Sequence, residues 1–354
     1  MDMNLKKTTL GIMALLVSAT LFAGCGGGGG GSSDPKGSGS SADKPSAAPI
    51  AKFELKGEPD STFPVGNKTA KVYELKGLAE DEDFNFTGER IAQAGDAIYI
   101  CGERIENKDK DGNGKEVQGL FKLPIKDMKL SSKEFITEAY VDSDHTRNLT
   151  VSGGNILFEQ KAGGGHKLGV YSGLGLGKEP DKWKDDYDEM VGSLEGDDIL
   201  MVRSLDTICV GKRNLSEIKG VKEVAANVRE TIKMKDAGPL RPVYIDANEM
   251  FLSCPTDSDG FTTVLLRFDR QGKLLSQYEG IKDIPDGWAV TKHYILQAGD
   301  DGNMVIYNRE DGKRVFDSKL RDMKPSYLAP MGDDMVLLCS NSFGELKFFI
   351  MDLK

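Results

Sequence analysis

The stretch Gly196-Asp-Asp-Ile-Leu-Met-Val202 decides the fold, because it places a tight turn before a short strand-forming run and recurs in altered form. The same pattern appears at 95–101, 154–158, 246–252, 292–296 and 332–338. The spacings are 58, 43, 51, 44 and 41 residues when the residues taken as equivalent are Ile98, Ile156, Ile199, Met250, Tyr294 and Met335. A period of about 40–50 residues indicates repeats that each supply one small sheet.

Repeats of this length, each with four short strands, are typical of β-propeller blades. Each repeat continues with a second apolar run, such as 263–268 or 304–307. Glycine, at 42 of 354 residues, is well above its average share of ~7% and supplies the many turns that such a fold needs. We therefore expect an all-β fold, a β-propeller with six blades, with seven blades as the alternative.

The last repeat ends after its third strand, so its outer strand has to come from elsewhere. Residues 70–77 alternate as a strand does and precede the first repeat. We expect this N-terminal strand to close the ring as the outer strand of the last blade, which removes an open sheet edge. The segment 51–57 nearly duplicates it, which keeps a partial seventh blade open. The stretch 221–232 fits a short helix as well as a strand.

Two turns carry a family resemblance. Asp269-Arg-Gln-Gly-Lys273 and Arg309-Glu-Asp-Gly-Lys313 follow third strands, with glycine supplying the positive φ of a hairpin turn. In this the chain resembles bacterial propellers of the PQQ-like and YVTN type. The resemblance covers about residues 68–354, concerns architecture, and implies no catalytic residues.

The N-terminus has the layout of an export signal. Lys6 and Lys7 precede an apolar run at 10–23, which is short for a membrane span, since spanning takes ~20 residues. Leu21-Phe-Ala-Gly-Cys25 resembles the lipobox of bacterial lipoproteins, although that family usually has Leu where Phe22 stands. The resemblance implies that Cys25 becomes the first residue and carries a diacylglycerol thioether and an N-linked acyl chain. An ordinary cleaved signal and an uncleaved anchor are the alternatives.

A flexible tether follows Cys25. Six glycines and a Ser/Gly/Pro-rich segment reach about 27 Å for 24 residues, and several acyl chains on one cysteine anchor a protein durably. The expected parts are the signal peptide 1–24, the lipidated cysteine and linker 25–49, and the propeller 50–354. The expected location is the cell envelope, outside the cytoplasm. Since Gly26 stands where many inner-membrane lipoproteins have Asp, an organism with two membranes would hold the protein in its outer membrane.

The net charge of the chain argues against one class of partner. The net charge of −10 argues against nucleic acid as a partner, because a protein that binds nucleic acid needs positively charged side chains to neutralise the phosphates.

We expect the four further cysteines to be buried without disulfides, since facing sheets pack about 10 Å apart and a disulfide needs Cα atoms within ~7 Å. These cysteines are Cys101, Cys209, Cys254 and Cys339.

One segment resembles part of a calcium loop. Residues 109–114 place Asp109, Asp111 and Asn113 at the first three oxygen-ligand positions, with glycine at the sixth. Leu120 replaces the glutamate of position 12, so a solvated hairpin loop is the alternative to a Ca²⁺ site. No other cofactor is expected. The histidines stand in different repeats, which does not predict a metal site or a catalytic triad; they are His145, His166 and His293.

The best candidate for ligand binding lies before the recurring strands. The propeller resemblance implies that ligands bind where loops converge around the channel mouth. Arginines at matching positions of three repeats bind carboxylate or phosphate, and nearby aromatic faces suit sugars or apolar groups. The candidates are Arg90, Arg147, Arg241, Trp288 and Tyr327. The alternative is that each arginine pairs with an acidic loop residue, such as Asp83 or Asp144.

Two function classes remain open. The first is a membrane-tethered binding or scaffold module for a protein or an envelope glycan. The second is a propeller enzyme of the lactonase or glycan lyase type, which needs a metal or an acid/base pair in the channel. No catalytic residue is identified from the sequence, so the binding module is the favoured interpretation.

Overall fold

Strands dominate the computed structural model, and they pair almost entirely with their neighbours in sequence. The structure describes residues 53–77, 84–85, 91–107, 114–138, 149–152, 155–162, 165–172, 189–195, 198–214, 217–234, 238–256, 262–282, 284, 287–299, 301–320, 323–325, 327–342 and 345–354. These residues belong to the compact unit Ser46–Lys354. The lipid-attachment candidate Cys25 therefore lies outside the described residues.

Three sheets have four consecutive strands in sequence order. They are β12 (Glu189–Glu195), β13 (Asp198–Arg203), β14 (Thr207–Asn214) and β15 (Glu217–Ala225); β16 (Arg241–Ile245), β17 (Glu249–Pro255), β18 (Thr263–Asp269) and β19 (Leu274–Glu279); and β20 (Trp288–Val290), β21 (Tyr294–Ala298), β22 (Asn303–Asn308) and β23 (Arg314–Lys319). This meander order is the one expected for a propeller blade.

The remaining strands form three further sheets. The first sheet has β4 (Ile91–Ala94), β5 (Ala97–Glu106), β6 (Lys115–Lys126) and β8 (Glu134–Glu138), extended by β3 (Phe84–Asn85) and β7 (Lys129–Leu130). A three-stranded sheet has β9 (Thr150–Ser152), β10 (Asn155–Ala162) and β11 (Gly165–Ser172). The closing sheet has β24 (Tyr327–Pro330), β25 (Met335–Ser342), β26 (Glu345–Asp352), β2 (Lys68–Leu75) and β1 (Ser61–Val65).

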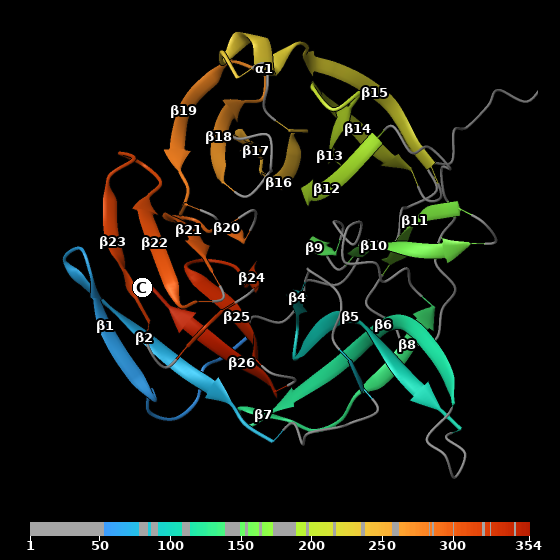
Figure 1. Cartoon of the computed structure of the whole chain (residues 1–354), viewed down its shortest axis with the longest axis vertical. Helices are drawn as coiled ribbons and strands as arrows, with labels where there is room; N and C mark the ends of the chain where they lie inside the picture. Colours follow the sequence, from blue (N-terminus) through green and yellow to red (C-terminus); the bar gives the residue numbers. More distant parts are fainter. Residues whose placement is uncertain are drawn as a thin grey trace, which may run out of the picture. The chain divides into compact units, whose positions relative to one another are not determined.

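The sheets follow one another around a common centre (Figure 1). The innermost strands pack in turn, from β4 through β9, β12, β16 and β20 to β24, which returns to β4. Hydrophobic clusters fill the spaces between sheets, so the second and third strands are covered on both faces. This explains why β21 is buried along its whole length while the outer strand β23 is largely exposed. The fold is an all-β propeller.

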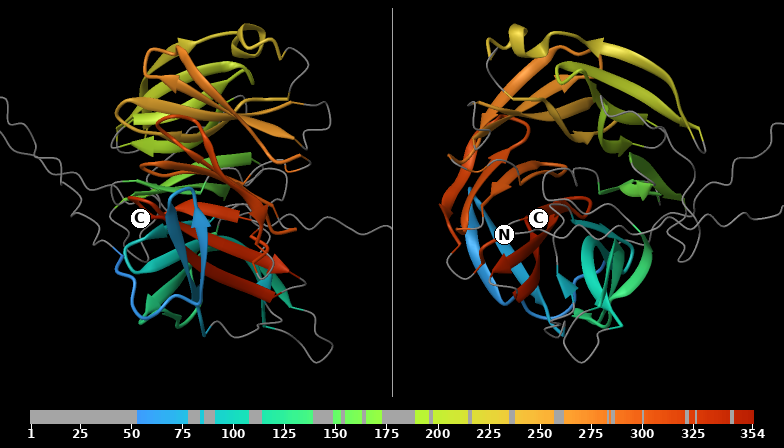
Figure 2. Two further views of the ribbon diagram at one scale, coloured as in Figure 1. Left: turned by 90° about the vertical axis from the view of Figure 1, so that its left-hand side faces the viewer. Right: turned by 45° about the vertical axis from the view of Figure 1, so that its right-hand side comes forward.

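The closure expected from the sequence is confirmed. β2 pairs antiparallel with β26, with Lys71 opposite Asp352 and Leu75 opposite Phe348. The N-terminal strand therefore supplies the outer strand of the last repeat. A further strand, β1, pairs with β2 and lies at the outer edge of this sheet, as the blue hairpin in Figure 2 shows.

The expected number of blades was wrong. In the described part of the chain, five sheets have a complete set of four strands, whereas the β9–β11 sheet has three, so neither six nor seven complete blades are present. All six recurring stretches are second strands, and each pairs on both sides. Counting them overestimates complete blades because the count does not test for an outer strand. The partial seventh blade at 51–57 is also wrong, since residues 53–57 are not a strand.

Two smaller expectations are resolved. The ambiguous stretch 221–232 divides into the end of β15 and one helical turn, α1 (Val228–Thr231). The four cysteines of the propeller are buried and form no disulfide bond, as expected. No helix in the described part of the chain is both long and apolar enough to cross a membrane.

Candidate functional site

The structure places three of the five predicted ligand residues at equivalent positions. Arg241, Trp288 and Tyr327 are the first residues of the innermost strands β16, β20 and β24. These strands are successive neighbours in the ring. Their starts lie at the same end of the ring of innermost strands, because every sheet runs in the same order from its inner strand. We call this end the rim. Arg90 and Arg147 lie outside the described residues.

Trp288 is part of the wall beneath the rim. Its side chain is buried, with 5% of the residue exposed, and its indole Nε1 donates to Thr263 Oγ1 at 2.9 Å. The ring packs in a cluster with Phe251 and Tyr278 between two sheets. Arg241 and Tyr327 are half-buried, so their side chains are more accessible than that of Trp288.

A buried glutamine, which no sequence motif marks, holds the connection that leads to β20. Gln297 accepts a hydrogen bond from Ile281 N at 2.5 Å and donates to Ile284 O at 3.3 Å. Gly280 lies so close to β18 that a Cβ would come within 2.1 Å of Thr263 O. The rim is therefore held in place at this connection by side-chain hydrogen bonds and close packing.

The calcium candidate stays a prediction. Asp109, Asp111 and Asn113 lie outside the described residues. Among the residues that are described, no group of three or more His, Cys, Asp or Glu is placed to hold a metal ion. In the similar turn at 300–302, Asp301 accepts from Asn303 N at 2.9 Å and pairs with Lys319 at 3.3 Å. The carboxylate of Asp301 therefore stabilises the turn in which it lies.

His293 joins two sheets. Its Nδ1 lies 2.6 Å from the buried Asp334 Oδ2, and Thr291 Oγ1 donates to Asp334 Oδ1 at 3.1 Å. Thr291 and His293 connect β20 with β21, whereas Asp334 immediately precedes β25. The contact therefore joins the turn of one sheet to the turn of the next.

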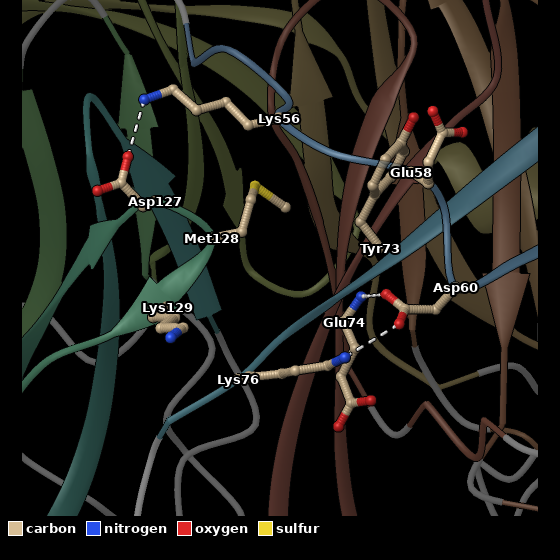
Figure 3. Close-up of a pocket in the computed structure, with 9 residues that line it drawn as sticks. All are labelled: Lys56, Glu58, Asp60, Tyr73, Glu74, Lys76, Asp127, Met128 and Lys129. Carbon is tan, nitrogen blue, oxygen red and sulfur yellow. Dashed lines mark hydrogen bonds and ion pairs between the residues drawn. The ribbon is translucent and has the colours of Figure 1, made fainter.

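A pocket of about 190 Å³ lies where the closing sheet meets the first sheet, and sequence reasoning missed it (Figure 3). The segment before β1, strand β2 with residue 76, and the β6–β7 turn form its walls. Its lining residues are Lys56, Glu58, Asp60, Tyr73, Glu74, Lys76, Asp127, Met128 and Lys129. We call it the seam pocket.

Two exposed ion pairs border the seam pocket. Lys56 Nζ lies 3.0 Å from Asp127 Oδ1, and Lys76 Nζ lies 3.2 Å from Asp60 Oδ1. A hydrogen bond from Glu74 N, followed by the ammonium of Lys76, holds the pKa of Asp60 below its usual value despite partial burial. The carboxylate of Asp60 is therefore fixed and charged at neutral pH.

Sequence comparisons identify no relative: no protein-family model matches the chain, and no curated protein matches it. Among solved structures, a protein of unknown function from Bacteroides thetaiotaomicron is 10% identical with a TM-score of 0.48, covering 80% of this chain and 76% of its own. BamB from Moraxella catarrhalis is 10% identical with a TM-score of 0.41, covering 87% and 98%. The WD40 β-propeller domain of Doa1 is 12% identical with a TM-score of 0.43, covering 84% and 97%. Similarities of this size carry no information about a ligand.

Proposed function

We propose that the chain is a lipid-anchored binding module of the cell envelope, whose propeller presents its rim to a protein or an envelope glycan. The observation that carries the proposal is the shared position of Arg241, Trp288 and Tyr327 at the starts of three neighbouring innermost strands. Arg241 and Tyr327, which are half-buried, would thereby contribute to one surface from two blades, above the buried ring of Trp288.

The route of the chain into the propeller supports this proposal. β2 is an outer strand, paired between β26 and β1. Residues 53–60, which precede β1, therefore lead into the propeller at the outer edge of this sheet, whereas the rim consists of the starts of innermost strands.

The anchor is tested by acyl labelling. Cys25→Ala is expected to abolish incorporation of labelled palmitate and to leave the precursor uncleaved or release the protein. Cys209→Ala, which alters a buried strand cysteine, is the control and is expected to keep the label. Unchanged labelling of Cys25→Ala would refute the lipid anchor.

The rim is tested by neutralising its arginines. The triple variant Arg90→Gln, Arg147→Gln, Arg241→Gln is expected to lose about tenfold or more of its binding to envelope glycan and protein fractions, because charge-assisted hydrogen bonds are lost. Its melting temperature is expected to stay close to that of the parent. Arg314→Gln on the outer strand β23 is the control. A triple variant that melts far lower and binds as before would show that the arginines are structural.

A further inference from the structure

The seam pocket separates charge across its width. In Figure 3, Lys56, Asp127 and Lys129 lie on one side, and Glu58, Tyr73, Asp60 and Lys76 lie on the other. The carboxylate of Glu74 points away from that of Glu58. Asp127 and Lys76 are each paired, with Lys56 and Asp60 respectively. A ligand that enters the pocket therefore meets a cationic wall and an anionic wall.

Several charged side chains that line the pocket are not paired within the described part of the protein. Among the described residues, the side chains of Glu58, Glu74 and Lys129 have no hydrogen-bond or ion-pair partner. Both ion pairs at the border are solvent-exposed, and exposed pairs are easily exchanged for contacts with a ligand. Charged groups are thus available on both walls.

Tyr73 lies beside Glu58 in the wall of the pocket. Burial is the main cause that raises the pKa of its phenol, and the negative charges of Asp352 and Glu58 raise it further. The ring belongs to a residue that is itself largely buried, so its position in β2 is fixed. A ligand cation between this ring and Glu58 would meet favourable electrostatics from both.

The walls are held by backbone hydrogen bonds across the seam. Lys76 N donates to Met128 O at 3.3 Å, and Leu130 N donates to Lys76 O at 2.8 Å. Asp127 and Met128 both have a positive φ, at 50° and 60°, an unfavourable conformation for methionine that the surrounding contacts must maintain. A frame fixed before binding lowers the entropy cost of holding a ligand.

We propose that the seam pocket binds a small zwitterion, with its ammonium group toward Glu58 and its anionic group toward Lys129. A volume of about 190 Å³ corresponds to about six waters at roughly 30 Å³ each, which suits a small metabolite. Amino acids, short peptides and phosphorylated amines share this chemistry. The site is separate from the rim, so its failure would leave the proposed function untouched.

The test measures binding to the full chain in detergent by calorimetry. The probes are phosphoethanolamine and glycylglycine as zwitterions, and ethanolamine and inorganic phosphate as their halves. Because a zwitterion contacts both walls and each half contacts only one, a zwitterion is expected to bind about tenfold or more tightly than either half. Tighter binding of phosphoethanolamine would identify the preferred anionic group as a phosphate, and tighter binding of glycylglycine would identify it as a carboxylate. Either result supports the proposal.

Two single variants separate the walls. Glu58→Gln is expected to weaken binding of the zwitterions and ethanolamine about three- to tenfold and to leave phosphate binding unchanged. Lys129→Gln is expected to weaken the zwitterions and phosphate and to spare ethanolamine. Glu54→Gln and Lys126→Gln are matched controls, because both residues are exposed, near the pocket and outside its lining.

A second measurement checks the location. Because the ligand contacts both sides of the seam, it is expected to slow amide hydrogen exchange at Lys76 and Leu130, whose N–H groups bond across it. The proposal is overturned if no zwitterion binds at millimolar concentration, if zwitterions bind no better than their halves, or if Glu58→Gln and Glu54→Gln behave alike.

Discussion

Arg309 shows how one side chain joins two sheets. Its guanidinium pairs with Asp246 and, at 2.8 Å, with Glu249, donates to Thr291 O at 3.0 Å, and lies 4.9 Å from the ring centroid of Phe251. Arg270 repeats the arrangement one sheet earlier, where it pairs with Asp198 and donates to Asp246 O at 2.6 Å. Each arginine follows a third strand and pairs with a carboxylate at or just before the start of the second strand of the preceding sheet.

Removing this arginine is expected to destabilise the propeller. Only 12% of the Arg309 side chain is exposed, so Arg309→Met leaves the largely buried carboxylate of Asp246 without its arginine and that of Glu249 with Arg267 alone. The expected loss in free energy of unfolding is about 2–4 kcal/mol, measured by denaturant titration. The control Lys319→Met removes an exposed pair with Asp301 and is expected to cost about 0–1 kcal/mol. Similar losses in both variants would contradict the role given to Arg309.

At the scale of elements, the sequence predicted the closing strand but not the strand beside it. β2 was found because residues 70–77 alternate and the last repeat lacks an outer strand. β1 was missed because Pro64 interrupts a short run, although Gly66 and the following Asn67 between two runs are a hairpin signal. The hairpin also contacts the neighbouring sheet. The ring centroids of Phe63 and Phe316 are 4.9 Å apart, and Gly66 N donates a hydrogen bond to Val315 O at 3.0 Å.

The closing strand is tested by deletion. Deleting residues 50–80 is expected to lower the melting temperature strongly, because it exposes β26 and removes the β1–β2 hairpin. Deleting 26–49 is expected to change it little. Should the larger deletion fail to fold, Val72→Asp and Lys71→Asp make the same comparison, since Val72 is buried between sheets and Lys71 is exposed. Equal melting temperatures within either pair would show that β2 does not support the ring.

At the scale of the whole molecule, the sequence repeat predicted the strands that are buried between sheets. The second and third strands lie between sheets, so their continuous apolar runs marked them at 246–252 and 263–268. Outer strands such as β23 are exposed and carry no such signal, which is why the number of complete blades was wrong. The arginine candidates were chosen from matching positions of the repeat, with two aromatic residues near them, and their role in binding stays a prediction. The seam pocket could not be predicted in this way, since Lys56 and Asp127 are 71 residues apart and belong to no common motif.

Acid is expected to weaken the ring at several junctions together. Burial alone would raise the pKa of Asp198, Asp246 and Glu249, but hydrogen bonds and charges from Arg270, Arg309, Arg267 and Lys212 outweigh it and hold all three below their usual values. A carboxylate whose pKa is lower in the folded state binds fewer protons there than in the unfolded chain. Its stabilising contribution is complete above the unfolded pKa, near 3.8 for Asp and 4.5 for Glu, and is lost as pH falls through the folded value.

The melting temperature is therefore expected to be insensitive to these groups between pH 6 and 8 and to fall steeply below about pH 4. Scanning calorimetry across this range measures the effect. Arg309→Met provides the internal check, because it removes the main partner of Asp246 and a partner of Glu249, so their pKa values move back toward or above the usual range. That variant should lose less free energy of unfolding than the parent on acidification, because the folded pKa values of these carboxylates are no longer held as far below the unfolded values. A variant with the same acid-dependent loss as the parent would show that these carboxylates are not what couples pH to the stability of the ring.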